Sequence, residues 1–466
     1  MAMSWPQLLN SERRRQTTIP TDHREQFERD YDRSIFSTPV KRLQDKAQVF
    51  PLEPHDAVRT RLTHSLEVSS VARGLATRIS RGLLEAGEIG PGMDRQIEAI
   101  ATTCGLIHDL GNPPFGHAGE EAIQEWFRER IGEPELRKRL DGRDQLIQDF
   151  LQFEGNAQTL RLVAKLQILA DENGLNLTYG TLSAACKYIA PSHEAVRGGD
   201  HARSKPGYFA SENELIGEIR GRTGTGDARN PITYLVEAAD DIVYSIADIE
   251  DAVKKGVLSW RDLREELDGE SLGIPRGSMS KVWDRKDLIL GPGGPEGDGA
   301  LPGDIHASAL RTAMIGVLVE AATEGFRSHY ERIMQGSYGA DLFSGGWAES
   351  LIEGLKKMGR QRIYCTPATL KLELAGRRII QDLMDLFWEG ASVLPVDGPP
   401  KTKTFPGKLG TLLSESYRMV FQLSLRSAGT ALPEDYRRFQ LVTDYVCGMT
   451  DSFAKRLHAE LTNGQG

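Results

Sequence analysis

The stretch Gly105-Leu106-Ile107-His108-Asp109-Leu110-Gly111-Asn112-Pro113-Pro114 decides the fold that we expect for this chain. Apolar residues lead into it at helical spacing, so we expect a helix with one buried face that delivers His108 and Asp109 and ends before the proline pair. Burying two polar, titratable side chains is costly unless something pairs them, and a metal ion would do so. A helix end with a solvent-facing His and Asp stays open as the alternative for this segment alone.

Two other segments with helical patterns supply the same kinds of side chain. His64 lies in the segment 61–67 and Asp240 in the segment 237–244. Two imidazoles and two carboxylates suit a borderline divalent ion and leave coordination positions open for water and phosphate oxygens. We expect Mn²⁺ or Mg²⁺, with Fe, Co, Ni and Zn as the other candidates. A single His on an apolar helix is more often a packed core residue, so it is the set of four that predicts a metal site.

Composition and charge indicate a soluble globular protein. The chain of 466 residues has a net charge of −9, which argues against a protein coated with nucleic acid but leaves room for a local basic groove. No unbroken apolar run reaches the roughly 18 residues of a membrane span, and residues 1–15 lack the apolar core of a signal peptide. The cysteines are too widely spaced for a zinc ribbon or a disulfide framework. We therefore expect a cytoplasmic protein.

Helical periodicity runs along most of the chain, and no alternating stretch is long enough for a major sheet. We therefore expect an all-α protein. Two stretches interrupt the pattern: 191–230 is polar and rich in Gly, Arg and Ser, and 270–303 is dense in Gly and Pro. We expect both to be irregular and the second to be a mobile loop or linker. One last helix is expected to follow Pro433 and to include Phe453.

An ordered series of motifs covers most of the chain: 33–37, 41–49, 59–68, 105–117, 153–158, 234–251 and 444–451. Through this series the chain resembles the HD-domain deoxynucleoside triphosphate triphosphohydrolases, the bacterial dGTPase-like family, and more distantly the vertebrate SAM-and-HD-domain dNTPase. The resemblance implies an HD-domain helical core with additional C-terminal helices and irregular insertions. We expect an N-terminal segment at 1–58 that contributes to the site and the oligomer, a catalytic core at 59–268, a flexible insert at 269–303 and a C-terminal helical region at 304–466.

The resemblance implies metal-dependent hydrolysis of dGTP, and of other dNTPs, to the deoxynucleoside and tripolyphosphate. Attack at the α-phosphorus expels the nucleoside 5′-oxygen, a basic alkoxide that needs a proton. His117 and Glu120 lie three residues apart at the start of an expected helix, so they share a face and the carboxylate would orient the ring and raise its pKa. The resemblance makes both catalytic and leaves open whether His117 acts as acid or base. Spacing alone also fits a surface His beside a helix N-terminal carboxylate.

Asp240, Tyr244 and Asp248 are spaced by four residues and form one stripe on a helix. By resemblance Asp240 is a metal ligand, Tyr244 packs against the deoxyribose, and Asp248 binds the 3′-hydroxyl together with Gln44. A ring beneath C2′ would exclude ribonucleotides by steric clash. Taken singly, Tyr244 could instead be a core residue and Asp248 a residue of a solvated face.

A bound triphosphate requires several cations and hydrogen-bond donors. The resemblance assigns substrate contacts at or near the phosphates to Arg61, Asn156, Lys187, Tyr188 and Lys205. Lys187 also fits a lysine at the C-terminal end of a helix, and Ile189 departs from the Thr or Pro of the family pattern. No base-reading residue is assigned, although Glu373 lies in a region that contributes to the base or effector side in relatives.

Two other functions stay open. A different HD phosphohydrolase, such as a nucleotidase or a cyclic-dinucleotide phosphodiesterase, would share the metal ligands, but the remaining histidines are too scattered to indicate a second metal site. A catalytically silent, nucleic-acid-responsive oligomeric scaffold would be free to lose the metal ligands and the catalytic pair named above. All of these residues are present, which argues against this function. The resemblance also implies a homo-oligomer, a tetramer or hexamer, and a dNTP activator or single-stranded DNA as regulators. We expect no membrane partner.

Overall fold

The helical periodicity of the sequence is realised in a computed structural model, which describes residues 2–16, 23–48, 58–167, 173–291, 302–426 and 432–463. In these ranges the chain forms helices α1 to α21 and one parallel pair of very short strands, β1 (Ala190–Pro191) and β2 (Pro206–Tyr208). The prediction of an all-α protein is confirmed. Short 3₁₀ and π segments join the helices: η1 (Leu43–Asp45), η2 (Phe127–Ile131), η3 (Leu162–Leu166), η4 (Ser192–Glu194), η5 (His201–Arg203), η6 (Ala210–Glu212) and η7 (Gly359–Ile363).

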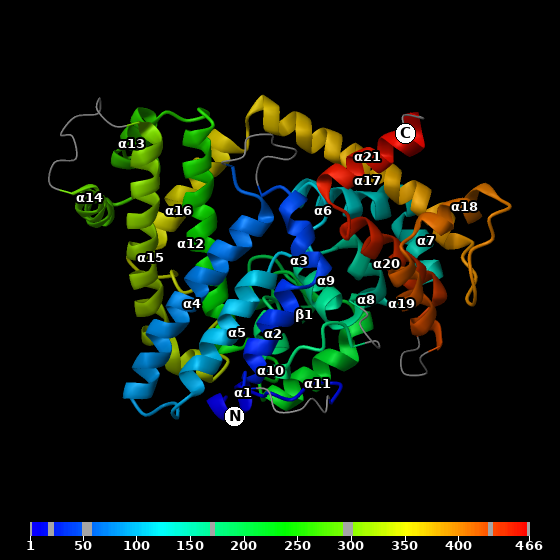
Figure 1. Cartoon of the computed structure of the whole chain (residues 1–466), viewed down its shortest axis with the longest axis horizontal. Helices are drawn as coiled ribbons and strands as arrows, with labels where there is room; N and C mark the ends of the chain where they lie inside the picture. The colour runs from blue at the N-terminus through cyan, green and yellow to red at the C-terminus, as the bar shows by residue number, and fades with distance from the viewer. Residues whose placement is uncertain are drawn as a thin grey trace.

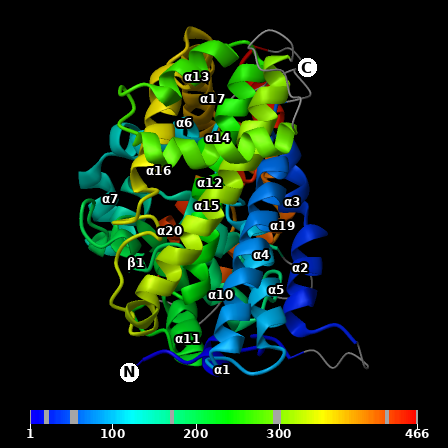
Figure 2. The same cartoon turned by 90° about the vertical axis from the view of Figure 1, so that its left-hand side faces the viewer.

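A first hydrophobic core is built around long helices that pack along one another, on the left of Figure 1 and in front in Figure 2. Its helices are α1 (Trp5–Leu8), α4 (Arg61–Glu85), α5 (Met93–Ile107), α12 (Pro231–Lys254), α13 (Trp260–Asp268), α14 (Arg276–Leu290), α15 (Gly303–Met334) and α16 (Glu349–Met358). Helix α15 is long and apolar enough to cross a membrane, but 56% of the apolar window is buried inside the fold. It packs against α12, α14 and α4, as expected of a core helix.

A second core fills the right-hand half of Figure 1. Its helices are α3 (Thr38–Arg42), α6 (Gly116–Trp126), α7 (Glu133–Arg139), α8 (Asp144–Leu151), α9 (Gly155–Arg161), α10 (Tyr179–Ala185), α11 (Asn213–Thr223), α17 (Pro367–Ser392), α19 (Glu415–Arg426), α20 (Glu434–Cys447) and α21 (Asp451–Asn463). Helix α18 (Phe405–Leu412) packs on α17. Helix α2 (Gln26–Ile35) packs on α5. Residues before 50 and after 430 thus share a core with the middle of the chain.

Helix α5 runs from one core to the other. Its residues Ile97 and Ile100 are buried in the first core, whereas Leu106 and Ile107 are buried in the second. A Cβ atom on Gly105 would lie 2.7 Å from the Cα atom of Ser69, so only glycine lets α5 approach α4 this closely. The end of α5, where the fold-deciding motif begins, therefore lies where the two cores meet.

Three expectations about local structure are wrong. The 270–303 stretch contains α14, whose Met279 and Val282 are buried at helical spacing between Gly- and Pro-rich flanks; positions 292–301 of that stretch lie outside the described residues. The 191–230 stretch contains the β1–β2 pair and α11, because apolar residues of α11 face the second core. The single helix expected after Pro433 is two helices, α20 and α21, separated by a turn at 448–450.

Candidate metal centre and active site

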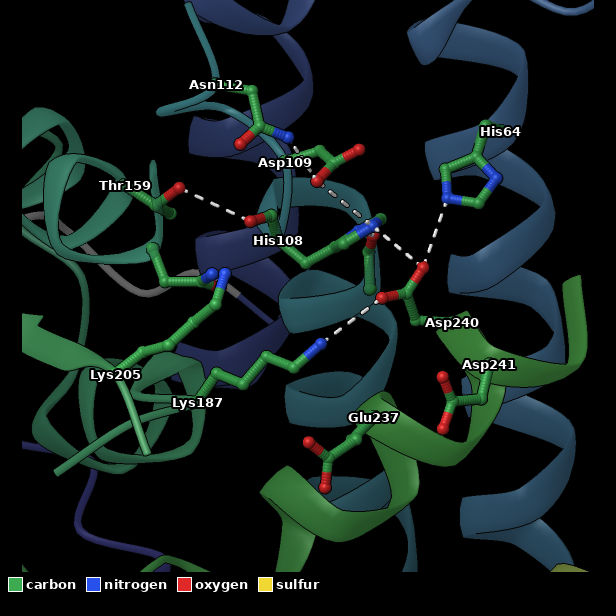
Figure 3. A network of polar contacts seen from close by, with 12 residues as sticks. His64, His108, Asp109, Asn112, Thr159, Lys187, Lys205, Glu237, Asp240 and Asp241 are labelled. Atoms are coloured by element: carbon green, nitrogen blue, oxygen red, sulfur yellow. Dashed lines mark hydrogen bonds and ion pairs between the residues drawn. The ribbon is translucent and has the colours of Figure 1, made fainter. Parts of the chain in front are cut away.

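Three helices that pack together bring the candidate metal ligands to one place. His64 lies in the first turn of α4, after an N-cap at Thr60 whose side chain accepts a hydrogen bond from the Thr63 N–H. His108 is the C-terminal cap residue of α5, and Asp240 lies in the middle of α12. Because α4 packs on both α5 and α12, these side chains converge, as Figure 3 shows.

The distances within this group suit a shared ion. Asp240 Oδ1 lies 3.2 Å from His64 Nε2 and 3.5 Å from His108 Nε2, and Asp109 Oδ1 lies 3.7 Å from His108 Nε2. The ligand atoms of His64, His108 and Asp109 lie within 4.8 Å of one another. Donors at about 2.1 Å from one ion are about 3.0–3.4 Å apart in octahedral or tetrahedral geometry. The atoms therefore need to move little to bind a common metal ion.

The His108 ring is oriented as a metal ligand. Its Nδ1–H donates a hydrogen bond of 2.7 Å to the Gly105 carbonyl oxygen, which leaves the lone pair of a neutral ring on Nε2. That Nε2 is buried and makes no hydrogen bond with any residue that the structure describes. A buried imidazole nitrogen usually has a hydrogen-bond partner. One that lacks such a partner and faces two carboxylates is typical of a metal-binding site.

The electrostatics of the group also favour a cation. Burial lowers the pKa of His108, but Asp109 and Asp240 outweigh burial and raise that pKa to about 9. Burial raises the pKa of Asp240, yet His108 and Lys187 hold it well below its ordinary value. These two partly buried carboxylates favour a positive charge nearby, which a proton on His108 or a divalent cation can supply.

Asp109 is held by two neighbours. Its Oδ2 accepts a hydrogen bond of 2.5 Å from Arg61 Nη1, and its Oδ1 accepts one of 2.6 Å from Asn112 Nδ2. Burial raises the pKa of Asp109, but Arg61 and His108 lower it to about 2. Asp109 is therefore ionised and fixed in direction, as a metal-ligand carboxylate needs to be.

A cavity of about 430 Å³ opens beside this group, within the size range of small-molecule sites. Residues far apart in the sequence line it: Ala47, Gln48, Arg61, His108, Asp109, Asn112, Phe115, Gly116, His117, Ala118, Glu120, Glu154, Asn156, Lys187, Tyr188, Lys205, Asp240, Asp241, Tyr244, Tyr364, Thr369 and Glu373. Most of the site residues expected from the sequence are in this set. His64 lies behind Asp240, outside the lining, and Gln44 and Asp248 are not in it either.

His117 and Glu120 form a pair on the first turn of α6. His117 Nδ1 lies 3.3 Å from Glu120 Oε2, and the His117 side chain is 88% exposed whereas that of Glu120 is 10% exposed. The other carboxylate oxygen of Glu120 accepts a hydrogen bond of 2.6 Å from the Gly155 N–H. The hydrogen bond with Glu120 raises the pKa of His117. The ring is thus open to the cavity while its partner is fixed.

The expected phosphate-binding residues are held by carboxylates. Lys187 Nζ lies 3.4 Å from Asp240 Oδ2, as Figure 3 shows. Lys205 Nζ lies 2.9 Å from Glu154 Oε2, and Asn156 Nδ2 donates to Glu154 Oε1 at 2.7 Å. Glu154 was not among the site residues expected from the sequence, because its position before α9 signals only an N-cap.

The two residues expected at the sugar, Tyr244 and Asp248, both contact Tyr364. Tyr244 lines the cavity and stacks on Tyr364, with ring centroids 6.2 Å apart. Asp248 is 2% exposed, and its Oδ2 accepts a hydrogen bond of 2.6 Å from the Tyr364 hydroxyl. Burial raises the pKa of Asp248 to about 7. Asp248 therefore lies behind Tyr364, a residue that was not expected at the site from the sequence.

Gln44 is exposed on η1 and is not among the residues that line the cavity, so its contact with the sugar stays a prediction. Gln48, four residues later, lines the cavity instead, and its Oε1 is buried without a hydrogen bond to any described residue. Gln44 lies within η1, which ends at Asp45, whereas Ala47 and Gln48 follow the end of this turn and line the cavity.

Comparisons with known proteins agree with this geometry. Residues 61–176 match the model of the HD domain family. The chain is 36% identical to a deoxyguanosinetriphosphate triphosphohydrolase-like protein of Listeria monocytogenes, over 98% of this chain and 99% of the relative. It is 34% identical to a probable deoxyguanosinetriphosphate triphosphohydrolase of Pseudomonas aeruginosa (92% of this chain, 91% of the relative) and 33% identical to a deoxyguanosinetriphosphate triphosphohydrolase of Yersinia pseudotuberculosis (92% of each). The chain therefore belongs to the HD-domain family of deoxynucleoside triphosphate triphosphohydrolases.

Proposed function

We propose that this enzyme hydrolyses dGTP, and other dNTPs, to the deoxynucleoside and tripolyphosphate in a reaction that requires Mn²⁺ or Mg²⁺. One observation carries the proposal: a single cavity joins a metal-competent His/Asp group, three cationic side chains and a His–carboxylate pair. Fe, Co, Ni and Zn are the other metals that this ligand set accepts.

The metal would be held by His64, His108, Asp109 and Asp240. When bound, it would neutralise phosphate charge and polarise the centre under attack. Arg61, Lys187 and Lys205 add positive charge from the protein, and Asn156 and Tyr188 add donors in the same cavity. Because Lys187 and Lys205 already pair with Asp240 and Glu154, the triphosphate would share these cations with the carboxylates.

Proton transfer is the task that His117 and Glu120 fit. The water oxygen forms a bond to the α-phosphorus, the bond between this phosphorus and the 5′-oxygen breaks, and the leaving oxygen gains a proton while water loses one. Glu120 orients the His117 ring and favours its protonated form. His117 is therefore suited to protonate the 5′-oxygen, and the same pair could accept the proton from water in the opposite sense.

For the sugar we propose that the Tyr244 ring excludes a 2′-hydroxyl and that Asp248 binds the 3′-hydroxyl. Tyr244 is in the cavity lining, on the same helix as Asp240 and one turn further along. Asp248 can take this role once the Tyr364 hydroxyl gives up its hydrogen bond. Beside Gln44 we propose Gln48 as a further polar contact to the sugar, because its side-chain carbonyl oxygen lacks a partner among the described residues.

Product analysis tests the proposal. The purified protein is supplied with Mn²⁺ and each dNTP and NTP in turn, and products are separated by ion-exchange chromatography. Deoxynucleoside with tripolyphosphate is expected. Monophosphate with pyrophosphate, or diphosphate with phosphate, would show that another bond is cut and would favour a different HD phosphohydrolase. His193→Ala, which changes a histidine outside the cavity lining, is the matched control for His117→Ala.

We also propose a homo-oligomer, a tetramer or hexamer, in the cytoplasm. Large apolar side chains are well exposed on the single chain, among them Phe36 at 76%, Leu374 at 68% and Phe405 at 79%, and burying them would favour assembly. All four cysteines are free, which suits a reducing compartment. Native mass spectrometry tests the assembly. Turnover measured with dNTP mixtures and with single-stranded DNA tests whether either regulates the enzyme.

A further inference from the structure

We propose that Asp451, assisted by Lys46, is a positioning residue for the catalytic pair, an inference that rests on the function proposed above. Asp451 is the first residue of α21 and is 2% exposed. Its Oδ1 accepts a hydrogen bond of 3.0 Å from the Phe115 N–H, and its Oδ2 accepts one of 3.0 Å from the Ala47 N–H. Both N–H groups belong to residues that line the active-site cavity.

The turn that Asp451 holds is strained. Phe115 has a φ of 63° and Gly116 a φ of 58°, and the left-handed region is unfavourable for a side chain as large as that of Phe115. Such a conformation persists only where the surroundings fix it. His117 follows two residues later, on the first turn of α6. The direction of the His117 ring therefore depends on what fixes Phe115.

Lys46 contacts the beginning of the same turn, at Asn112. Its Nζ donates hydrogen bonds of 2.6 Å to the Asn112 carbonyl oxygen and 2.7 Å to the Cys447 carbonyl oxygen. Asn112 in turn donates to the metal-ligand candidate Asp109. Lys46 and Asp451, which we call the C-terminal clamp, thus tie residues 46–48, 112–117 and 447–451 together at the cavity.

The chemistry of the clamp explains why a carboxylate is needed. The two oxygens of Asp451 each accept from a backbone N–H, whereas the amide of an asparagine has one oxygen and an NH₂ group that cannot accept. Asp451→Asn therefore removes the acceptor of either the buried Phe115 N–H or the partly buried Ala47 N–H. Displacing a catalytic group by about 1 Å can lower turnover on the order of a hundredfold.

The experiment compares Asp451→Asn with the wild-type chain in three measurements: kcat and KM for dGTP, Mn²⁺ affinity, and amide hydrogen exchange by mass spectrometry. We expect kcat to fall on the order of a hundredfold, with KM and Mn²⁺ affinity changed less than about threefold, and exchange to rise in peptides covering 46–48 and 112–118. Ser452→Ala is the matched control, because Ser452 is the next residue and its hydroxyl donates a hydrogen bond to Asp45, which is exposed. It should leave all three measurements unchanged.

Lys46→Met removes the Nζ group that donates both hydrogen bonds on the other side, and it is the second variant if Asp451→Asn does not fold. The same local rise in exchange with the same fall in kcat supports the clamp. Unchanged exchange at 112–118, or raised exchange with unchanged kcat, overturns it, as does a loss of protection spread evenly over the chain. The exchange measurement needs no turnover. If the wild-type protein does not hydrolyse dNTPs, the proposed function is refuted. The exchange measurement still decides whether Asp451 holds the turn at 112–118.

Discussion

Removing the hydroxyl of Tyr364 should make the enzyme a better dNTP hydrolase and a less stable protein. In the structure this hydroxyl donates to Asp248 Oδ2 at 2.6 Å. If Asp248 binds the 3′-hydroxyl of the sugar, this hydroxyl must displace the Tyr364 hydroxyl. Because one hydrogen bond is exchanged for another, the exchange adds little to the free energy of substrate binding. In Tyr364→Phe the sugar hydroxyl would form that hydrogen bond without displacing another.

The magnitude follows from the bond that is exchanged. A hydrogen bond to a carboxyl group contributes about 1–2 kcal/mol net, and more when the group is charged. Each 1.4 kcal/mol corresponds to a tenfold change in an equilibrium constant. We therefore expect kcat/KM for dGTP to rise about 5- to 30-fold. The free energy of unfolding should fall by about 1–2 kcal/mol, because Asp248 loses its donor in the absence of nucleotide.

The assay measures kcat/KM for dGTP and for its 3′-deoxy analogue, together with urea unfolding. The analogue lacks the competing donor, so the preference for dGTP over the analogue should rise about tenfold. Tyr338→Phe is the control: its hydroxyl donates to the Asp341 carbonyl oxygen at 2.7 Å, outside the cavity lining. That variant should lose stability with unchanged kinetics. An unchanged or smaller preference for dGTP in Tyr364→Phe would refute the competition between the two hydroxyls.

Four further variants test other parts of the site and the fold. Asp240→Asn should weaken Mn²⁺ binding at least about tenfold by calorimetry, and unchanged affinity would exclude Asp240 as a ligand. His117→Ala should lower turnover about 10²- to 10⁴-fold while keeping Mn²⁺; loss of the metal would contradict its proton-transfer role. Tyr244→Ala should hydrolyse GTP or ATP, and unchanged discrimination against ribonucleotides would count against the steric exclusion. Glu250→Gln addresses acid stability: burial raises the pKa of Glu250, but Arg59 lowers it to about 2 from 4.5. That carboxylate therefore contributes roughly 3 kcal/mol above pH 4.5, lost as the pH falls from 4.5 toward 2. Urea unfolding at pH 7 and pH 3 should show a smaller pH dependence in the variant than in the wild type.

The sequence could predict that the expected metal ligands lie close together, because local pattern places each of them on its helix. His64, His108 and Asp240 each lie on a helix whose register follows from apolar spacing, and the ordered motifs place these helices in one fold. His117 and Glu120 are on the same turn, so their contact at 3.3 Å needs no knowledge of the rest of the chain.

The parts that the sequence did not predict depend on contacts between distant segments. Tyr364 meets Asp248 across 116 positions, and Asp451 meets Phe115 across 336. No periodicity links such residues. Glu154 shows the other difficulty, because a carboxylate at a helix start signals an N-cap and gives no hint that it also pairs with Lys205.

The position of α5 across the two cores has a consequence for how ligand binding is felt by the whole molecule. Asp240 and Tyr244 lie on α12 of the first core and His117 lies on α6 of the second, and all three line the cavity, so one nucleotide bound there would contact both halves. Because separating the two halves would release the nucleotide, its binding adds about 2.7 kcal/mol to the free energy of separation at a nucleotide concentration of 100 Kd. Bound substrate should therefore hold the two cores together and slow proteolysis of the segments between them. This effect does not require either core to unfold by itself.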